Sequence, residues 1–124
     1  GMPDMRGLTV IVTSGDADRL YSALLITSGT AAQGGAARVF CDGPAVPLLV
    51  PDTAAPLDAK RALHGQPRLS ELRIEAHDLG VRLIACQAGM ALAGLEIEAL
   101  GDGVEAGGLV GLMGDIGDDR LVTL

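Results

Sequence analysis

The sequence has almost no aromatic side chains, and this shortage argues against one broad class of function. Of its 124 residues, only Tyr21 and Phe40 are aromatic, and there is no Trp. Proteins that bind single-stranded nucleic acid rely on aromatic rings for base stacking. The net charge of −7 would also repel a phosphate backbone. Nucleic-acid binding is therefore not expected.

Cysteine is equally scarce, and long apolar runs are missing. Cys41 and Cys86 are too few for a disulfide framework, and they do not form a C-x-x-C pair. This usage predicts a reducing, cytoplasmic setting with free thiols. No apolar run approaches the length of a membrane span, and residues 2–12 are too short and too acidic for a signal peptide. We therefore expect no association with a membrane.

What the chain has instead is small aliphatic residues. Hydrophobic residues make up 48 % of the sequence, there are 18 Gly, and the mean hydropathy is +0.38. Residues 7–124 have the size of one domain, whereas residues 1–6 are interpreted as a tail in which Gly1 is an expression remnant. So high a hydropathy in a small chain predicts that another subunit covers some apolar surface, and hence a homo-oligomer.

Short apolar runs alternate with helical patterns along the chain. This order predicts a three-layer α/β/α sandwich with a mainly parallel sheet of about five strands. The segment 95–100 alternates apolar and polar residues and is interpreted as a short strand or an extended link. The segment 44–67 contains several prolines and allows only short helical pieces. The clear strand patterns cover residues 8–12, 37–41, 81–85 and 120–124, and the clear helical patterns cover residues 18–33, 69–79, 87–93 and 109–116.

Cys86 is the residue whose position most suggests chemistry. It follows the apolar run 81–85 and precedes a helical pattern. The carboxyl edge of a parallel sheet is where open α/β folds bind their ligands. Free N–H groups at a helix start also favour a thiolate. The small residues Ala88 and Gly89 would leave such a site open. A buried core thiol is the competing interpretation, since free cysteine is among the most buried residue types.

Other cysteine and metal chemistries have little support. His64 follows a proline-rich stretch and His77 lies on a polar helical face, so neither is expected to pair with Cys86 as a catalytic base. No ligand-pair spacing supports a metal site, and no cofactor is expected. Cys41 also ends a strand and is a candidate second thiol, although a packed core thiol is the favoured interpretation.

The polar turns at the same edge have simpler interpretations. The turn after the first strand holds one glycine and two aspartates, so it is not a phosphate cradle. Ser14 in this turn is a candidate pocket-lining residue near Cys86. The acidic residues Asp115, Asp118 and Asp119 are interpreted as a solvated turn between the last helix and the last strand.

These features together resemble the DsrE/DsrF-like sulfur-relay family, which includes the TusD and YchN-type proteins. The most telling parts are Cys86 with Gly94 eight residues later, and the segment 102–108. The resemblance implies a small three-layer α/β domain that forms trimers or hexamers. It also implies that Cys86 carries a persulfide, receives sulfur from a donor protein and passes it to an acceptor protein.

The first hypothesis is thus a cytoplasmic, sulfurtransferase-like sulfur carrier. In it, the N–H groups of Ala88 and Gly89 stabilise the sulfur anion, with Gln87 and Ser14 as polar neighbours. One alternative is a non-catalytic subunit of an oligomer, in which Cys86 is only buried. Another is a flavodoxin-like domain that binds a small molecule at the same edge, which the missing phosphate loop and the net negative charge disfavour.

Overall fold

Parallel strands form the centre of the molecule. The computed structural model describes residues 5–124, which leaves part of the predicted tail 1–6 outside the described residues. The sheet has five strands in the order β4-β3-β2-β1-β5, and all neighbouring pairs are parallel. The predicted fold class is therefore confirmed. The strands are β1 (Leu8–Val12), β2 (Ala37–Cys41), β3 (Arg82–Cys86), β4 (Val104–Gly107) and β5 (Arg120–Thr123).

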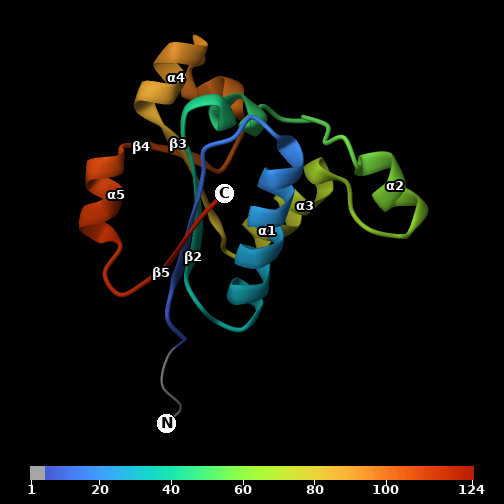
Figure 1. Cartoon of the computed structure of the whole chain (residues 1–124), viewed down its shortest axis with the longest axis horizontal. Helices are drawn as coiled ribbons and strands as arrows, with labels where there is room; N and C mark the ends of the chain where they lie inside the picture. Colours follow the sequence, from blue (N-terminus) through green and yellow to red (C-terminus); the bar gives the residue numbers. More distant parts are fainter. Residues whose placement is uncertain (1–4) are drawn as a thin grey trace.

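Helices cover the sheet unequally on its two faces. The long helices α1 and α3 pack against each other on one face, whereas the short helix α5 lies on the other (Figure 1). Helix α4 and the 3-10 helix η1 meet at the carboxyl ends of the strands. The helices are α1 (Ala17–Ala32), η1 (Gly43–Leu49), α2 (Asp58–Leu63), α3 (Leu69–Asp78), α4 (Gln87–Ala93), η2 (Ile97–Leu100) and α5 (Leu109–Asp115).

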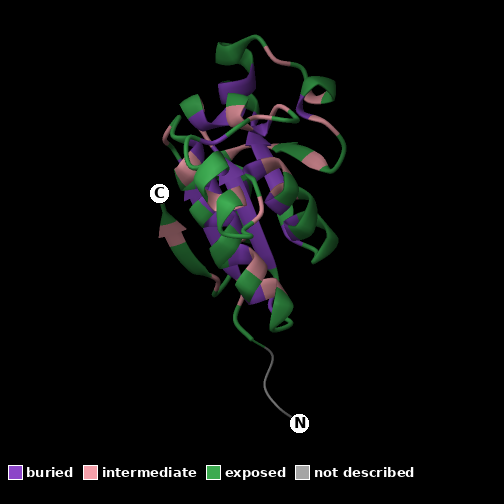
Figure 2. Ribbon diagram, turned by 90° about the vertical axis from the view of Figure 1, so that its right-hand side faces the viewer, coloured by how far each residue is buried: buried purple, intermediate pink, exposed green. Residues whose placement is uncertain are grey.

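The three central strands form because their residues are apolar on both sides. Strands β1 and β2 are buried at every position, and β3 is buried at every position after Arg82. Continuous burial of this kind is typical of parallel strands between two layers. In Figure 2 the buried residues follow the central strands, while the edge strand β5 near the C-terminus is exposed or half-buried. The core therefore lies between the central strands and the α1–α3 layer.

Local signals begin and end helices where the sequence predicts. Asp16 caps α1, since its side chain accepts a hydrogen bond of 2.9 Å from the N–H of Asp18. Helix α4 ends at Gly94, whose φ of 67° lies in the left-handed region that suits glycine. These signals set where α1 begins and where α4 ends.

Buried polar contacts order the proline-rich segment. Asp58 is buried and accepts hydrogen bonds of 2.9 Å from the N–H groups of Ala55 and Leu69. The Arg61 guanidinium lies 3.5 Å from the centre of the Tyr21 ring and forms an ion pair with Asp18. The short helical pieces expected here are thus η1 and α2, and α2 is anchored to α1 by charge and ring contacts.

The interpretation of residues 95–100 as a short strand or an extended link is wrong. This segment forms the 3-10 helix η2, and the fourth strand is β4, at Val104–Gly107. The alternation of apolar and polar residues fits a half-exposed turn as well as a strand. Residues 104–107 contain a single β-branched residue, so their sequence carries little strand signal. Pairing with β3, and not intrinsic propensity, makes them a strand.

Candidate functional site

Cys86 lies where a central strand becomes a helix. It is the last residue of β3 and the N-cap residue of α4, with extended backbone angles of φ −64° and ψ 124°. No side chain, that of Cys86 included, makes a capping hydrogen bond at this helix start. The residue is only 5 % exposed. Cys86 therefore combines a chemically suitable position with limited access.

The pairing of the strands shows which face of the sheet Cys86 occupies. Cys86 pairs with Gly107 on β4, and Ile84 pairs with Phe40 on β2. Side chains alternate between faces along a strand, and residues paired across parallel strands share a face. Cys86 therefore points to the α5 face, as Ile84 and Phe40 do. Cys41 pairs with Ala85 and points to the opposite face, under α1 and α3.

This arrangement separates the two thiols. Cys41 is completely buried, and this burial raises the pKa of its thiol to about 12, with the nearby Arg73 guanidinium acting in the opposite direction. The backbone of the sheet lies between the side chains of Cys41 and Cys86, so the structure does not bring the candidate second thiol to the candidate site. The environment of Cys41 is that of a core residue.

The candidate pocket-lining residues divide in the same way. Gln87 and Ala88 are exposed beside Cys86 at the start of α4. Gly89 is buried, and a Cβ added to it would lie 2.7 Å from Cγ2 of Val46 in η1. Gly89 therefore packs α4 closely against η1. The expectation from the sequence, that Gly89 leaves the site open, is wrong. Ser14 follows β1, two strands from β3, and its hydroxyl accepts a hydrogen bond from the N–H of Asp16. It is not brought next to Cys86.

The two histidines lie away from the thiol. His64 is exposed in the turn after α2. His77 is exposed near the end of α3, and its ring lies against Gly103, just before the amino end of β4. Cys86 is at the carboxyl end of β3, which is the other edge of the sheet. In the part of the chain that the structure describes, neither histidine is placed to act as a base for Cys86.

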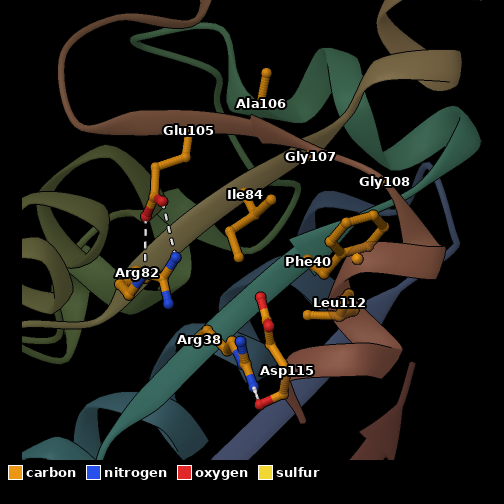
Figure 3. A pocket seen from close by; sticks show the side chains of 11 residues that line it. Arg38, Phe40, Arg82, Ile84, Glu105, Ala106, Gly107, Gly108, Leu112 and Asp115 are labelled. Atoms are coloured by element: carbon orange, nitrogen blue, oxygen red, sulfur yellow. Dashed lines mark hydrogen bonds and ion pairs between the residues drawn. The ribbon is translucent and has the colours of Figure 1, made fainter.

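A groove lies on the same face as Cys86, between β3, β4 and α5. It has a volume of about 160 Å³ and is half open to solvent. We call it the α5 groove. Its residues are shown in Figure 3 and fall into an apolar part, a glycine wall and a charged part. The apolar part consists of Phe40, Ile84, Ala106 and Leu112, and the glycine wall consists of Gly107, Gly108 and Gly111. The charged part consists of Arg38, Arg82, Glu105 and Asp115.

The charged part of the groove was not predicted as a site. Arg38 and Arg82 occupy equivalent positions on neighbouring strands and are paired in the register of β2 with β3. The signal was available, because an arginine inside a buried strand is unusual and needs partners. Two such residues, each one residue into a predicted strand, would have indicated a polar site on one face of the sheet.

Each arginine has an acidic partner, but the two pairs differ in exposure. Arg82 donates hydrogen bonds of 2.9 Å and 2.8 Å to the two carboxylate oxygens of Glu105, and both side chains are about half exposed. This contact lowers the pKa of Glu105. Arg38 is buried and donates to Thr9 and Asp119. Thr9 also donates to Asp119, so the interpretation of the acidic residues 115–119 as a simple solvated turn is wrong for Asp119.

Two other features of the described residues bear on function. No helix within residues 5–124 is long and apolar enough to cross a membrane. Within the same range, no group of three or more His, Cys, Asp or Glu side chains is arranged to hold a metal ion.

Comparison with known proteins identifies relatives of this architecture. Residues 52–121 match the sequence model of the DsrE/DsrF/DrsH-like family. That segment includes Cys86, β4 and α5. No curated protein sequence matches the chain significantly.

Solved structures with the same fold include proteins from bacteria and from Methanobacterium thermoautotrophicum. The ychN protein from E. coli is 18 % identical with a TM-score of 0.75, and the alignment covers 97 % of this chain and 100 % of that one. MTH1491 from Methanobacterium thermoautotrophicum, described as a protein of unknown function, is 15 % identical with a TM-score of 0.71, at 97 % and 100 % coverage. BT1422 from Bacteroides thetaiotaomicron, described in the same way, is 15 % identical with a TM-score of 0.65, at 95 % and 94 % coverage. At these identities the likeness extends to the fold alone.

Proposed function

The chain belongs to the DsrE/DsrF/DrsH-like family, and on that premise we propose that it is a cytoplasmic sulfur carrier that holds a persulfide on Cys86. In this reaction the Cys86 thiolate attacks the outer sulfur of a sulfane donor. A new S–S bond forms at Cys86 as the donor's S–S bond breaks, and the donor leaves as a thiolate. Attack by the thiolate of an acceptor protein on the terminal sulfur then returns Cys86 to a free thiolate.

The position of Cys86 at the junction of β3 and α4 is the observation that carries this proposal. The side chain stands at the carboxyl edge of the sheet, and the adjacent helix start has N–H groups that no side chain caps. Such groups interact favourably with a sulfur anion. The exposed residues Gln87 and Ala88 leave room for a docking partner above the thiol.

The surroundings of Cys41 support a one-thiol mechanism. The pKa of about 12 keeps the Cys41 thiol protonated at neutral pH, and a protonated thiol is a poor nucleophile. Its side chain is also on the far face of the sheet from Cys86. The sulfur therefore leaves Cys86 for a thiol on another protein, and Cys41 takes no part.

We also propose that the chain acts as a homo-oligomer whose interface includes α5. Of the large apolar residues of this helix, Leu112 is buried, while Leu109, Val110 and Met113 are 40 %, 90 % and 43 % exposed. An apolar helix face of this kind on an acidic, hydrophobic small domain suits a second copy of the same surface. Light scattering on the purified protein should show an oligomer, and Val110→Asp should reduce its mass.

The direct test is intact-mass analysis after incubation with a polysulfide donor. The expected result is the addition of one sulfur atom to the wild type and to Cys41→Ala, and none to Cys86→Ser. Circular dichroism on each variant establishes that it is folded. The proposal fails if the wild type gains no sulfur, or if Cys86→Ser gains as much.

A non-catalytic subunit is the alternative function, and the 5 % exposure of Cys86 is the observation that favours it. In that case the thiol would react with a small alkylating reagent only as fast as the folded chain opens. The two functions differ in how denaturant affects labelling. A working thiol labels rapidly without denaturant, whereas a core thiol requires it.

A further inference from the structure

The geometry of the α5 groove points to a binding site for a small zwitterionic thiol, which as its persulfide is the donor that loads Cys86. This inference rests on the proposed sulfur-carrier function and names the class of its donor: an amino-acid thiol of about the size of cysteine. The argument uses the position of the groove, the charges at its mouth and its size.

The groove lies on the same face of the sheet as the thiol, although Cys86 does not itself line it. Ile84 and Phe40 form its floor, and Gly107, which pairs with Cys86, forms its inner wall. Ile84 and Cys86 lie on the same face, two residues apart, or roughly 7 Å along the strand. The charged residues Arg38 and Arg82 are a further two residues back along their strands. They are thus roughly 13 Å along the strand from Cys86, and a ligand held there by its charged end has its other end on the Cys86 side of the groove.

The mouth presents both signs of charge. Arg38 uses Nε and Nη2 for protein contacts, whereas its Nη1 makes no hydrogen bond with residues 5–124. In the same range the Asp115 carboxylate forms no ion pair, and Figure 3 shows it turned into the groove toward Leu112. Arg82 and Glu105 complete the rim as an exposed pair. A ligand with a carboxylate and an ammonium group matches Arg38 and Asp115 better than a simple anion does.

The inner part of the groove suits sulfur. Its walls are the Phe40 ring, Ile84 and Leu112, together with the backbone of Gly107 and Gly108. A polarisable sulfur atom packs favourably against an aromatic edge and aliphatic groups. A Cβ added to Gly108 would meet no atom within 4 Å, so this wall is open on the side of the sheet edge.

The volume limits the ligand. A space of about 160 Å³ holds the equivalent of about five water molecules at roughly 30 Å³ each. A single amino acid with a short side chain fits this space, and because the groove opens to solvent, part of a ligand can lie outside it. In the transfer, Cys86 thiolate attacks the outer sulfur of the bound amino-acid persulfide. The S–S bond of the ligand breaks, and the amino acid leaves as a thiolate that takes a proton from water.

Binding is tested on the Cys86→Ser protein by titration calorimetry, so that no sulfur transfer occurs. The probes are L-cysteine, cysteamine, which lacks the carboxylate, and 3-mercaptopropionate, which lacks the ammonium group. We expect L-cysteine to bind and each single-charge analogue to bind about tenfold more weakly, the loss of one charge-assisted contact. Asp115→Asn should weaken the binding of L-cysteine by a similar factor. Asp118→Asn is the matched control, because it removes the same charge three residues further along the chain, outside the groove.

The outcomes separate this inference from the proposed function. No binding of L-cysteine, equal binding of the three probes, or equal effects of the two aspartate variants would overturn the groove as a zwitterion site, even if polysulfide still loads Cys86. If L-cysteine binds as expected but neither polysulfide nor cysteine persulfide adds sulfur to the wild type, the sulfur-carrier function fails and the binding site stands. Where both hold, Asp115→Asn should raise the KM for cysteine persulfide, whereas Asp118→Asn should leave it unchanged.

Discussion

Gly107 lies opposite Cys86 in the pairing of β4 with β3, so the strand beside the thiol carries no side chain at this level. A Cβ at Gly107 would lie 3.0 Å from Cγ2 of Ile84, on the face to which Cys86 also points. We therefore expect small reagents to reach the buried thiol over this glycine backbone at the edge of the sheet.

Gly107→Ala should slow the reaction of Cys86 with small thiol reagents and with polysulfide several-fold. The added methyl group occupies the route to the thiol, and its close contact with Ile84 should cost on the order of 1 kcal/mol of stability. The control is Gly114→Ala in α5, where the new methyl group would meet no atom within 4 Å. Equal labelling rates in the two variants would show that access does not pass over Gly107.

Gly89→Ala should destabilise the protein by about 1–3 kcal/mol, because its methyl group would overlap Val46. The measurement is chemical denaturation, with Gly29→Ala in α1 as the control. Gly29 has open space around it, so that change should stabilise the helix by about 0.5–1 kcal/mol. Adding Val46→Ala to Gly89→Ala should cost less than the sum of the two single changes. Additive costs would contradict a direct contact between α4 and η1 at these residues.

Burial of Cys41 predicts a loss of stability at alkaline pH. In the unfolded chain the thiol ionises near its ordinary pKa of about 8.5, whereas in the folded chain its pKa is about 12. Between these values the unfolded state binds fewer protons, so the free energy of unfolding falls as pH rises, by up to about 1.4 kcal/mol per pH unit. Below about pH 8 this thiol contributes no pH dependence.

The check is a comparison of wild type and Cys41→Ala by chemical denaturation from pH 7 to 10.5. The difference in stability between them should be constant up to about pH 8 and should then move in favour of Cys41→Ala. Burial also raises the pKa of Tyr21, but that residue is present in both proteins and cancels from the difference. Parallel stability curves over the whole range would contradict the buried, protonated Cys41.

Asp58→Asn should cost about 1–3 kcal/mol, although the two side chains have the same shape. Each carboxylate oxygen of Asp58 accepts a backbone N–H, from Ala55 and from Leu69. An amide offers one oxygen, so its NH₂ group would face a donor in a buried site. Asp16→Asn is the matched control, since Asn caps a helix about as well as Asp. Similar melting temperatures for the two variants would show that Asp58 does not hold the segment between η1 and α3.

The sequence predicted those parts of the fold in which the residues of a segment themselves determine its conformation and burial. The runs of β1, β2 and β3 are apolar on both faces, and Asp16, Gly80 and Gly94 bound helices by their own chemistry. β4 could not be predicted in this way. Its residues acquire a strand conformation by pairing with β3, which depends on the whole sheet.

The candidate site, like the fold, was predicted only in part. The position of Cys86 follows from one strand and one helix, which are adjacent in the chain. The separation of Cys41 from Cys86 depends on the register between β2 and β3. The α5 groove joins residues from β2, β3, β4 and α5, and the role of Asp119 depends on contacts with Thr9 and Arg38, more than 80 residues away. Such long-range relationships leave only a faint trace in the sequence, here the two arginines in buried strands.

The most direct test of the sulfur-carrier function is peptide mapping of the protein after polysulfide treatment, followed by addition of an acceptor thiol. The account predicts one extra sulfur atom on the peptide that contains Cys86, an unmodified Cys41 peptide, and return of Cys86 to the free thiol as the acceptor gains the sulfur. An unmodified Cys86 peptide, or a sulfur atom on Cys86 that no acceptor removes, would contradict it.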